Sequence, residues 1–241
     1  MPRIEASGIT DIGTVRQVNE DAWGVAPGLS LAIVADGIGG APCGEVASEI
    51  TVAAITAYMK DPPEDLPIDL RLKEAIREAN RRVRERAANE NGCRGMGSTV
   101  VAAAWDGDRL IVANAGDSRA LLLRGGKLNQ LSYDQTVGHE MEERLGWTPE
   151  QSKSSGFSHV LTMAVGVSDD ILIRIHEEPW TPGEQLLLCT DGICGVLGDD
   201  EIIEALVENR SLPAALSELI DLSRAAGSRD NMTAVVVRHL E

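Results

Sequence analysis

Four aspartates stand at the ends of apolar runs in this sequence, and they are the residues best placed to do chemistry. The runs are continuous rather than alternating, which is typical of strands buried on both faces. Four carboxylates gathered in one place could not all stay ionised without a cation between them. An all-oxygen set suits Mg²⁺ or Mn²⁺ better than zinc. The runs and their acids are 31–35 with Asp36, 110–115 with Asp117, 185–190 with Asp191 and, in inverted order, 232–237 with Asp230.

Each of these acids has a simpler explanation when it is taken alone. An Asp-Gly pair after a strand, as at Asp36 and Asp191, is mostly a turn. A Gly-Asp-Ser turn accounts fully for Asp117. Only the repetition of the pattern favours a site. The glycines after Asp36 let the backbone turn sharply and bring a bare carbonyl close to whatever the carboxylate holds.

A second group of charges lies near the N-terminus, where Arg16, Glu20 and Asp21 fall within six residues before a short predicted strand. Such a group is more often a surface loop, with Arg16 a structural partner of Glu20 or Asp21. If a metal centre lies beside them, the same charges become candidate site residues. Small hydroxyls at strand positions, as in Ser98 and Thr99, are explained by packing and not by a nucleophilic role.

The elements needed to position these residues can be predicted from periodicity. Apolar residues at three- and four-residue steps indicate helices over about 43–60, 72–87, 140–145, 200–208 and 212–225. Strands are predicted at 7–13, 98–105, 110–115, 119–123, 127–131, 172–177, 185–190 and 232–237, the four from 98 to 131 forming an antiparallel meander. The segment 132–157 loses this regularity and is predicted to be an insertion over a sheet edge.

The distribution of elements favours an α+β fold. Strands cluster as antiparallel neighbours while long helices come in pairs, one pair early and one late. Both predicted sheets have apolar runs that need cover on two sides. We therefore expect a central antiparallel β-sandwich flanked by pairs of α-helices on both sides, in a single domain over residues 1–241.

Composition excludes several classes of function. The formal charge is −16, with 38 acidic against 22 basic residues, which argues against binding to nucleic acid or to a membrane surface. No run approaches a membrane span, and the first residues lack the features of a signal peptide. A cytoplasmic protein is expected. The cysteines at 43, 93, 189 and 194 contain no C-x-x-C pair, so reduced thiols are expected, with Cys189 a small core residue.

Six motifs along the chain resemble those of the PP2C (PPM) metal-dependent serine/threonine phosphatases, in their short bacterial form. The resemblance runs nearly end to end, and six motifs in the right order are far more specific than any one of them. It implies the same β-sandwich flanked by helices. The motifs are Arg16-x-x-Asn19-Glu20-Asp21-Ala22, Val34-Ala35-Asp36-Gly37-x-Gly39-Gly40, Gly97-Ser98-Thr99-Val100, Asn114-Ala115-Gly116-Asp117-Ser118-Arg119, Leu188-Cys189-Thr190-Asp191-Gly192 and Asp230-Asn231-Met232-Thr233.

The resemblance implies a site with two Mn²⁺ or Mg²⁺ ions. Asp36 matches the aspartate that bridges both ions, and the carbonyl of Gly37 matches a ligand of the second ion. Asp191 and Asp230 match the carboxylates on the first ion. These three aspartates are thereby the expected catalytic residues.

Further roles are implied around this centre. Glu20 and Asp21 match the acidic pair that contacts the second ion, directly or through water. Asp117 matches the acid that, with Asp191, can hold a third, weaker ion in bacterial members. Arg16 matches the arginine that grips the substrate phosphate, a task that suits a guanidinium fork better than an ammonium group.

The implied activity is a phosphoprotein phosphatase acting on phosphoserine and phosphothreonine. Two cations about 3.5–4 Å apart would share a water, lower its pKa and aim the bridging hydroxide in line at phosphorus. The expected enzyme is a monomer that opposes a bacterial Ser/Thr kinase. Two alternatives stay open: a pseudophosphatase that binds phosphoproteins with little turnover, and a hydrolase of small phosphomonoesters or nucleotides.

Two positions depart from the family pattern. Eukaryotic relatives often place a histidine immediately after the Asp-Gly pair as a general acid, whereas this sequence has Ile38, as in bacterial relatives with an apolar residue there. The leaving oxygen must then take its proton from water or a metal-bound group. Met163 stands where many bacterial members resemble L-T-R-A-L-G, so the contact of that arginine near the flap is lost.

Overall fold

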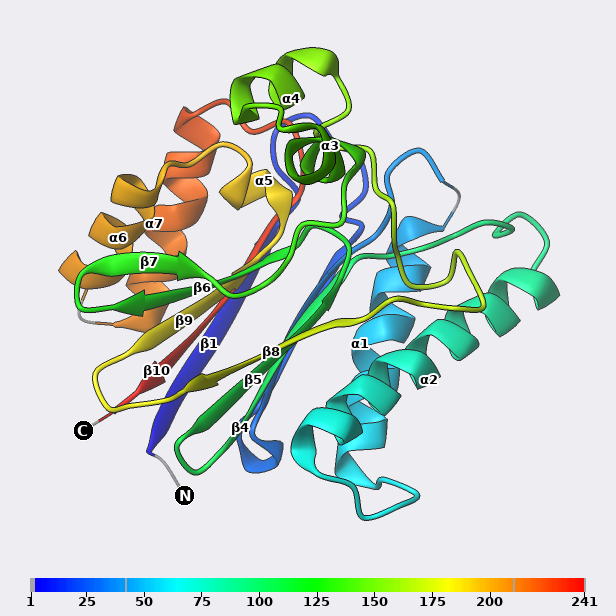
Figure 1. Cartoon of the computed structure of the whole chain (residues 1–241), viewed down its shortest axis with the longest axis horizontal. Coiled ribbons are helices and arrows are strands. Elements are labelled where there is room, and N and C mark those ends of the chain that lie inside the picture. The colour runs from blue at the N-terminus through cyan, green and yellow to red at the C-terminus, as the bar shows by residue number, and fades with distance from the viewer. Residues whose placement is uncertain (1–2, 42, 210, 241) are drawn as a thin grey trace.

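The protein is a sandwich of two five-stranded antiparallel sheets (Figure 1). The computed structural model describes residues 3–41, 43–209 and 211–240. In spatial order, the first sheet comprises β1 (Ile4–Asp11), β10 (Met232–His239), β9 (Gln185–Cys189), β6 (Arg119–Arg124) and β7 (Lys127–Gln130). The second comprises β2 (Asp21–Ala26), β3 (Leu31–Asp36), β4 (Val100–Asp106), β5 (Arg109–Ala115) and β8 (Arg174–Pro179).

The central strands are buried on both faces, as their continuous apolar runs predict. Alternate residues of β3, such as Ala32 and Val34, face the opposite sheet and pack with Leu188 of β9 and Val235 of β10. The intervening residues, such as Ile33, face the helices. Because side chains alternate across a strand, a run that is apolar throughout can satisfy two cores at once.

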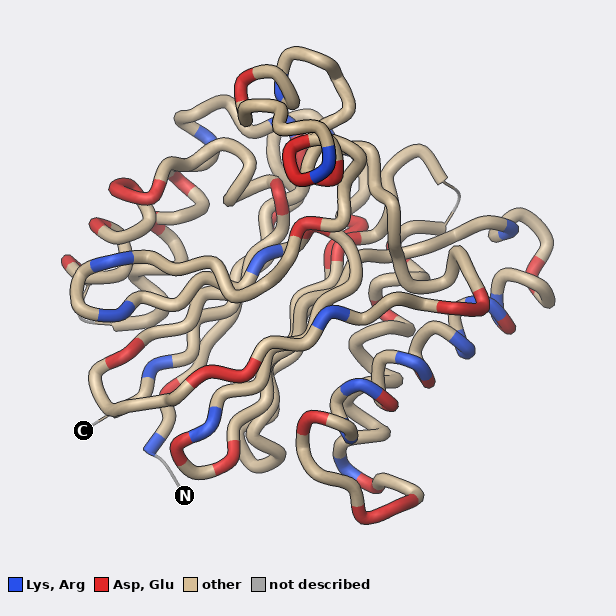
Figure 2. Tube along the Cα trace, in the orientation of Figure 1, with Lys and Arg blue, Asp and Glu red and all other residues tan. Residues whose placement is uncertain are grey.

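Paired helices cover the outer faces of the sandwich. α1 (Gly44–Lys60) and α2 (Ile68–Asn89) pack on the second sheet, and α6 (Asp199–Glu208) and α7 (Leu212–Ala225) pack on the first. The outer side of α2 alternates basic and acidic positions (Figure 2), and Glu78 pairs there with Arg81 and Arg82. Those charges form a solvated helix face. Within the described ranges, none of the helices has the length and apolar character needed to cross a membrane.

The predicted α+β sandwich with flanking helix pairs is confirmed, but the predicted meander is wrong. β4 and β5 form a hairpin in the second sheet, and β6 and β7 form another in the first. Between them the chain crosses from sheet to sheet at Gly116, which has a φ of 112°. A local turn signal gives no information on which sheet the next strand joins, so periodicity alone could not reveal this crossing.

The segment after β7 contains more helix than predicted. α3 spans Val137–Leu145 and begins at Thr136, whose hydroxyl accepts a hydrogen bond from the His139 amide. α4 (Pro149–Ser155), which the periodicity did not predict, has a capping box made by Thr148 and Gln151. The two helices lie at one end of the sandwich, near α5 (Asp191–Cys194), and not along a sheet edge (Figure 1).

The prediction of reduced thiols is wrong for two of the four cysteines. Cys43 and Cys93 form a disulfide across 50 residues of sequence, with 5.3 Å between their Cα atoms. Cys189 and Cys194 are free and buried, and Cys189 is a core residue as predicted. The disulfide partners carry no spacing signature, since they meet only because α1 packs against α2.

Ile76 tests the contribution of α2 to the core, because its side chain is fully buried between the helix and the second sheet. The Ile76→Ala variant should lower the free energy of unfolding by about 2–5 kcal/mol, through lost transfer energy and the cavity left behind. Urea denaturation followed by circular dichroism measures this. Val207→Ala, at a position 61% exposed on α6, is the control and should change stability by less than about 0.5 kcal/mol. Equal effects at both positions would contradict this packing.

Candidate active site

The strand ends bring acids from both sheets to the same end of the sandwich. Asp21 at the start of β2 lies directly opposite Asp36 at the end of β3 in the second sheet. Asp191 follows β9 and begins α5, while Asp230 precedes β10, the neighbouring strand of the first sheet. Thr190, next to Asp191, donates a hydrogen bond of 3.0 Å to Asp21 and thereby joins the two sheets. The predicted convergence of Asp36, Asp191 and Asp230 is therefore present.

The acids of this cluster lie close enough to perturb one another. Burial, followed by the charges of Asp21, Asp191, Asp117 and Asp230, raises the pKa of Asp36 well above its ordinary value. Burial and the charges of Asp191 and Asp230 raise the pKa of Asp21 to about 7. Burial and the charge of Asp191 likewise raise the pKa of Asp117 to about 7. Without cations, several of these groups would have to hold protons.

Two carboxylate oxygens of the cluster receive no hydrogen bond from the described part of the protein. Oδ1 of Asp21 and Oδ1 of Asp191 are buried and accept no hydrogen bond within the described part of the chain. A buried, unpartnered carboxylate oxygen is costly, whereas divalent cations bind such oxygens readily. The donor set therefore fits Mg²⁺ or Mn²⁺. Across residues 3–41, 43–209 and 211–240, no three His, Cys, Asp or Glu side chains form a closed metal-binding group.

Gly37 lies in a position that permits no side chain. A Cβ atom there would lie 2.3 Å from the carbonyl oxygen of Gly44 and 2.7 Å from that of Glu20. The Gly37 amide donates to the Glu20 carbonyl at 2.9 Å, which fixes the acidic pair of β2 beside the loop after β3. The glycine is thus required by close backbone approach, as the Asp-Gly pattern predicts.

Arg16 lies beside the acids at the mouth of the site. Its Nη2 donates to Oδ2 of Asp230 at 2.6 Å, and its Nη1 lies 3.6 Å from Oε2 of Glu20. The guanidinium also passes over Gly39, where a Cβ atom would be 2.8 Å from Nη1. The structural pairing with Glu20 therefore exists, and the partly exposed guanidinium is also within reach of a ligand at the cluster. Its role in binding phosphate stays a prediction.

Asn231 is a site residue for which sequence reasoning assigned no role. Its Nδ2 donates to the carbonyls of Ile12 and Val18, at 2.9 and 3.1 Å, and its Oδ1 accepts from the amide of Glu20 at 2.8 Å. One buried side chain thus closes the loop that carries Arg16 and aligns β2 next to Asp230. A polar residue at the start of an otherwise apolar strand was the available signal.

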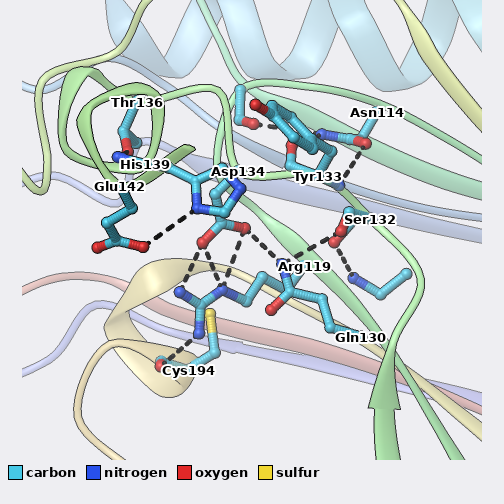
Figure 3. Close-up of polar contacts among 12 residues, drawn as sticks. Asn114, Arg119, Gln130, Ser132, Tyr133, Asp134, Thr136, His139, Glu142 and Cys194 are labelled. Carbon is cyan, nitrogen blue, oxygen red and sulfur yellow. Dashed lines mark hydrogen bonds and ion pairs between the residues drawn. The ribbon is translucent and has the colours of Figure 1, made fainter. Parts of the chain in front are cut away.

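A second unpredicted feature links the segment after β7 to α5. Arg119 donates to Asp134 through Nη2 at 2.6 Å and to the Cys194 carbonyl through Nη1 at 3.3 Å, as Figure 3 shows. Arg119 lies two residues after Asp117, and Cys194 lies three after Asp191. The same region borders a cavity of about 240 Å³ lined by both aspartates and by His159. The ion pair therefore positions two cluster acids relative to α3 and α4.

Three further residues singled out in the sequence contribute packing and backbone contacts. Ser98 and Thr99 are buried and hydrogen-bond to the backbone of Asp36, so their predicted packing role is confirmed. Met163 packs against the core around α1 and α2, and its sulfur accepts a hydrogen bond from the Leu172 amide at 3.4 Å. Met163 therefore contributes a packing contact and no charge.

The raised pKa values predict how stability depends on pH when metal is absent. Asp21 and Asp117 have a pKa of about 7 in the folded chain and about 4 when unfolded, so stability is fullest below about pH 4 and falls as pH rises towards 7. In EDTA, the melting temperature should drop by roughly 5–10 °C between pH 5 and pH 7.5. Millimolar Mn²⁺ at pH 7.5 should reverse the drop. Differential scanning fluorimetry measures both; a flat or rising profile in EDTA would contradict the mutual repulsion of these acids.

Comparison with known proteins places this site in a family. The family model described as Protein phosphatase 2C matches residues 14–238. The serine/threonine phosphatase stp of Listeria monocytogenes is 33% identical over 238 residues, covering 95% of this chain and 93% of that protein. The serine/threonine protein phosphatase PstP of Mycobacterium tuberculosis is 33% identical over 228 residues, covering 94% of this chain and 43% of that longer protein.

Solved structures agree with the sequence comparison. The crystal structure of the Mycobacterium tuberculosis phosphatase PstP/Ppp superposes with a TM-score of 0.89 at 31% identity, covering 99% of each chain. The PstP catalytic domain in complex with two manganese ions gives 0.87 at 30% identity, again over 99% of each chain. The resemblance expected from six motifs is therefore confirmed, and the chain belongs to the protein phosphatase 2C family.

Proposed function

We propose that this protein phosphatase removes phosphate from phosphoserine and phosphothreonine side chains of proteins, with two Mn²⁺ or Mg²⁺ ions as cofactors. The observation that carries the proposal is the convergence of buried and half-buried carboxylates from both sheets, two of them with buried, unpartnered oxygens, beside one arginine. The relatives named above support it, since they are serine/threonine phosphatases and the PstP catalytic domain binds two manganese ions.

The ligand roles follow from where the acids meet. Asp36 would bridge the two ions, because the charges of four other acids of the cluster, Asp21, Asp191, Asp117 and Asp230, act on it. Asp191 and Asp230, on neighbouring strands of the first sheet, would hold the first ion. The second ion would take the Gly37 carbonyl with Glu20 and Asp21, which adjoin it through the second sheet.

Asp117 is proposed as a ligand of a third, weaker ion together with Asp191. The charge of Asp191 is the next largest cause, after burial, of the raised pKa of Asp117. Asp117 and Asp191 also line the same cavity, which α4 borders. Occupancy there would couple the segment after β7 to the main cluster.

When bound, the ions supply activation of a water nucleophile and neutralisation of charge on the phosphoryl group. The protein supplies positioning. Arg16 would exchange its contact with Asp230 for a contact with the substrate phosphate. A planar guanidinium can donate two parallel hydrogen bonds to phosphate oxygens. The strand ends hold Asp36, Asp191 and Asp230 rigidly, so little reorganisation is needed as charge develops. Ile38 has no proton to donate, so the leaving serine or threonine oxygen would be protonated by water or a metal-bound group.

The loop around Arg16 favours a protein substrate over a small phosphoester. Val15 and Val18 flank Arg16 and are each 51% exposed, and Ile12 at the start of the loop is 40% exposed. Apolar side chains around a phosphate-binding residue would contact the neighbours of a phosphorylated residue in a polypeptide. A sugar phosphate or nucleotide would gain little from them. The strongly negative chain would also disfavour substrates with acidic flanks.

The pseudophosphatase remains the second candidate, and no observation favours it, since every acid that the family pattern requires is present. Several further expectations also stay as predictions: a single domain over residues 1–241, a monomeric state, a cytoplasmic location and a cognate Ser/Thr kinase as the opposing enzyme.

Hydrolysis of p-nitrophenyl phosphate distinguishes the enzyme from the binding module. The chain should turn this substrate over with added Mn²⁺ and lose activity in EDTA. The Asp36→Asn variant should lose at least about 100-fold in kcat/KM because one carboxylate charge at the shared position is removed. The matched control is Asp65→Asn, at a fully exposed acid, which should retain activity. Correct folding without Mn²⁺-dependent turnover would favour the pseudophosphatase.

The apolar loop can be tested by comparing two substrates. The Val15→Ser/Val18→Ser double variant should reduce kcat/KM about 5- to 20-fold on a phosphothreonine peptide with apolar flanks, because ~1–2 kcal/mol of apolar contact is lost. Its kcat/KM on p-nitrophenyl phosphate should stay within about twofold of the parent. Val207→Ser, at a similarly exposed position on α6, is the control. Equal losses of kcat/KM on both substrates would show that the loop does not contact the residues that flank the phosphothreonine.

A further inference from the structure

The Cys43–Cys93 disulfide joins the two chain segments that meet at Asp36. Cys43 immediately precedes α1, shortly after the loop that follows β3, and Cys93 lies in the turn after α2. Neither cysteine belongs to the motifs that carry the family resemblance. The covalent bond therefore adds a constraint beside the candidate active site that the proposed catalytic function does not explain.

On the Cys93 side, the chain reaches the cluster within a few residues. The Cys93 carbonyl accepts a hydrogen bond of 3.1 Å from the Met96 amide, which shapes the turn. The Gly97 carbonyl then accepts from the Ile38 amide at 3.0 Å, and the Thr99 amide donates to the Asp36 carbonyl at 2.8 Å. Movement of this segment would be transmitted directly to the backbone at both ends of the Asp-Gly pair.

On the Cys43 side, the contact with the cluster is closer still. Gly44, bonded to Cys43, touches two of the proposed contributors to the second ion: a Cβ on Gly44 would lie 2.4 Å from Oε1 of Glu20, and one on Gly37 would lie 2.3 Å from the Gly44 carbonyl oxygen. Cys43 itself has a φ of 60°, in the left-handed region that non-glycine residues adopt only when their surroundings hold them there. The bond to Cys93 is such a constraint.

Access to the two sulfurs is unequal. Cys93 is only 4% exposed, whereas Cys43 is half-buried and is the more accessible residue of the pair. The free cysteines, Cys189 and Cys194, are buried in the other core, under α5, and cannot exchange with this pair without unfolding. Exchange chemistry is thereby confined to Cys43 and Cys93.

We propose that Cys43 and Cys93 form a reversible thiol–disulfide site that controls binding of the second divalent ion, the disulfide form being the competent one. The assignment of Gly37 and Glu20 to that ion rests on the proposed function. The reductant is a dithiol, and the oxidant is a low-molecular-weight disulfide such as oxidised glutathione. Reduction releases the left-handed Cys43 and lets Gly44 move away from Gly37 and Glu20.

The exchange is balanced in both directions. A thiolate of the dithiol attacks Sγ of Cys43, the bond between the two cysteines breaks, and Sγ of Cys93 leaves with the electron pair and takes up a proton. The second thiol of the reagent then displaces Cys43, which also becomes a thiol. Two electrons and two protons have passed to the protein, and the reductant leaves as a cyclic disulfide. Oxidised glutathione reverses the change and leaves as two glutathione thiols.

The test begins with the number of thiols and not with activity. Protein purified without reductant is denatured and alkylated with iodoacetamide, and its mass is measured by mass spectrometry. The mass should show two alkylated cysteines before treatment with dithiothreitol and four after it. The reduced and disulfide forms are then prepared without metal and desalted without oxygen, and their melting temperatures and Mn²⁺ affinities are compared. The reduced form should melt about 10 °C lower and bind Mn²⁺ about tenfold more weakly at one site by titration calorimetry. Treatment with oxidised glutathione should restore both values.

The Cys43→Ser/Cys93→Ser variant is the matched control. It should resemble the reduced parent in melting temperature and in Mn²⁺ affinity, and neither dithiothreitol nor oxidised glutathione should change it. Four reactive thiols in the parent after oxidised glutathione would overturn the proposal, as would a disulfide whose reduction leaves Mn²⁺ affinity unchanged. Because thiol count, melting and metal binding need no substrate, failure of the proposed phosphatase activity would be seen separately, with p-nitrophenyl phosphate.

Discussion

Mutual repulsion among buried and half-buried carboxylates is the constraint on which the rest of this structure depends. Burial and neighbouring acids raise the pKa of Asp36, Asp21 and Asp117 together, so the cluster is unfavourable as a set of bare anions. Only a rigid surround can keep such groups in place. The two sheets provide it, because Asp36 ends and Asp117 follows a strand that is buried along nearly its whole length, and Asp21 is paired with Asp36 on the neighbouring strand.

The sandwich brings the acids together by register and by a few polar contacts between the sheets. Asp21 faces Asp36 across one hairpin, and the hydroxyl of Thr190 ties Asp21 to the strand end beside Asp191. Asn231 performs the equivalent task for the loop that carries Arg16. None of these tying residues carries a charge, so they add no repulsion to the cluster they organise.

The acids that would hold ions lie at strand ends of the sandwich, whereas Arg16 is partly exposed where the site would meet other molecules. Arg16 is shared between Asp230 and Glu20, with the exposed side chains of Val15 and Val18 beside it. The segment with α3 and α4 connects to the cluster through the ion pair of Arg119 and Asp134. Ile38 and Met163 add no charge to this region, and Met163 packs against the core around α1 and α2.

The sequence by itself indicated the sandwich and its flanking helices, because continuous apolar runs carry that information locally. The repetition of acids at the ends of such runs, together with the six motifs, also indicated that Asp36, Asp191 and Asp230 converge. The sequence could not determine that β5 and β6 belong to different sheets, since a turn at Gly116 looks the same either way. The tying role of Asn231, the ion pair of Arg119 with Asp134 and the disulfide between Cys43 and Cys93 were also decided only by tertiary structure. Each joins residues distant in sequence, and no periodicity or spacing records which distant side chains packing will bring together.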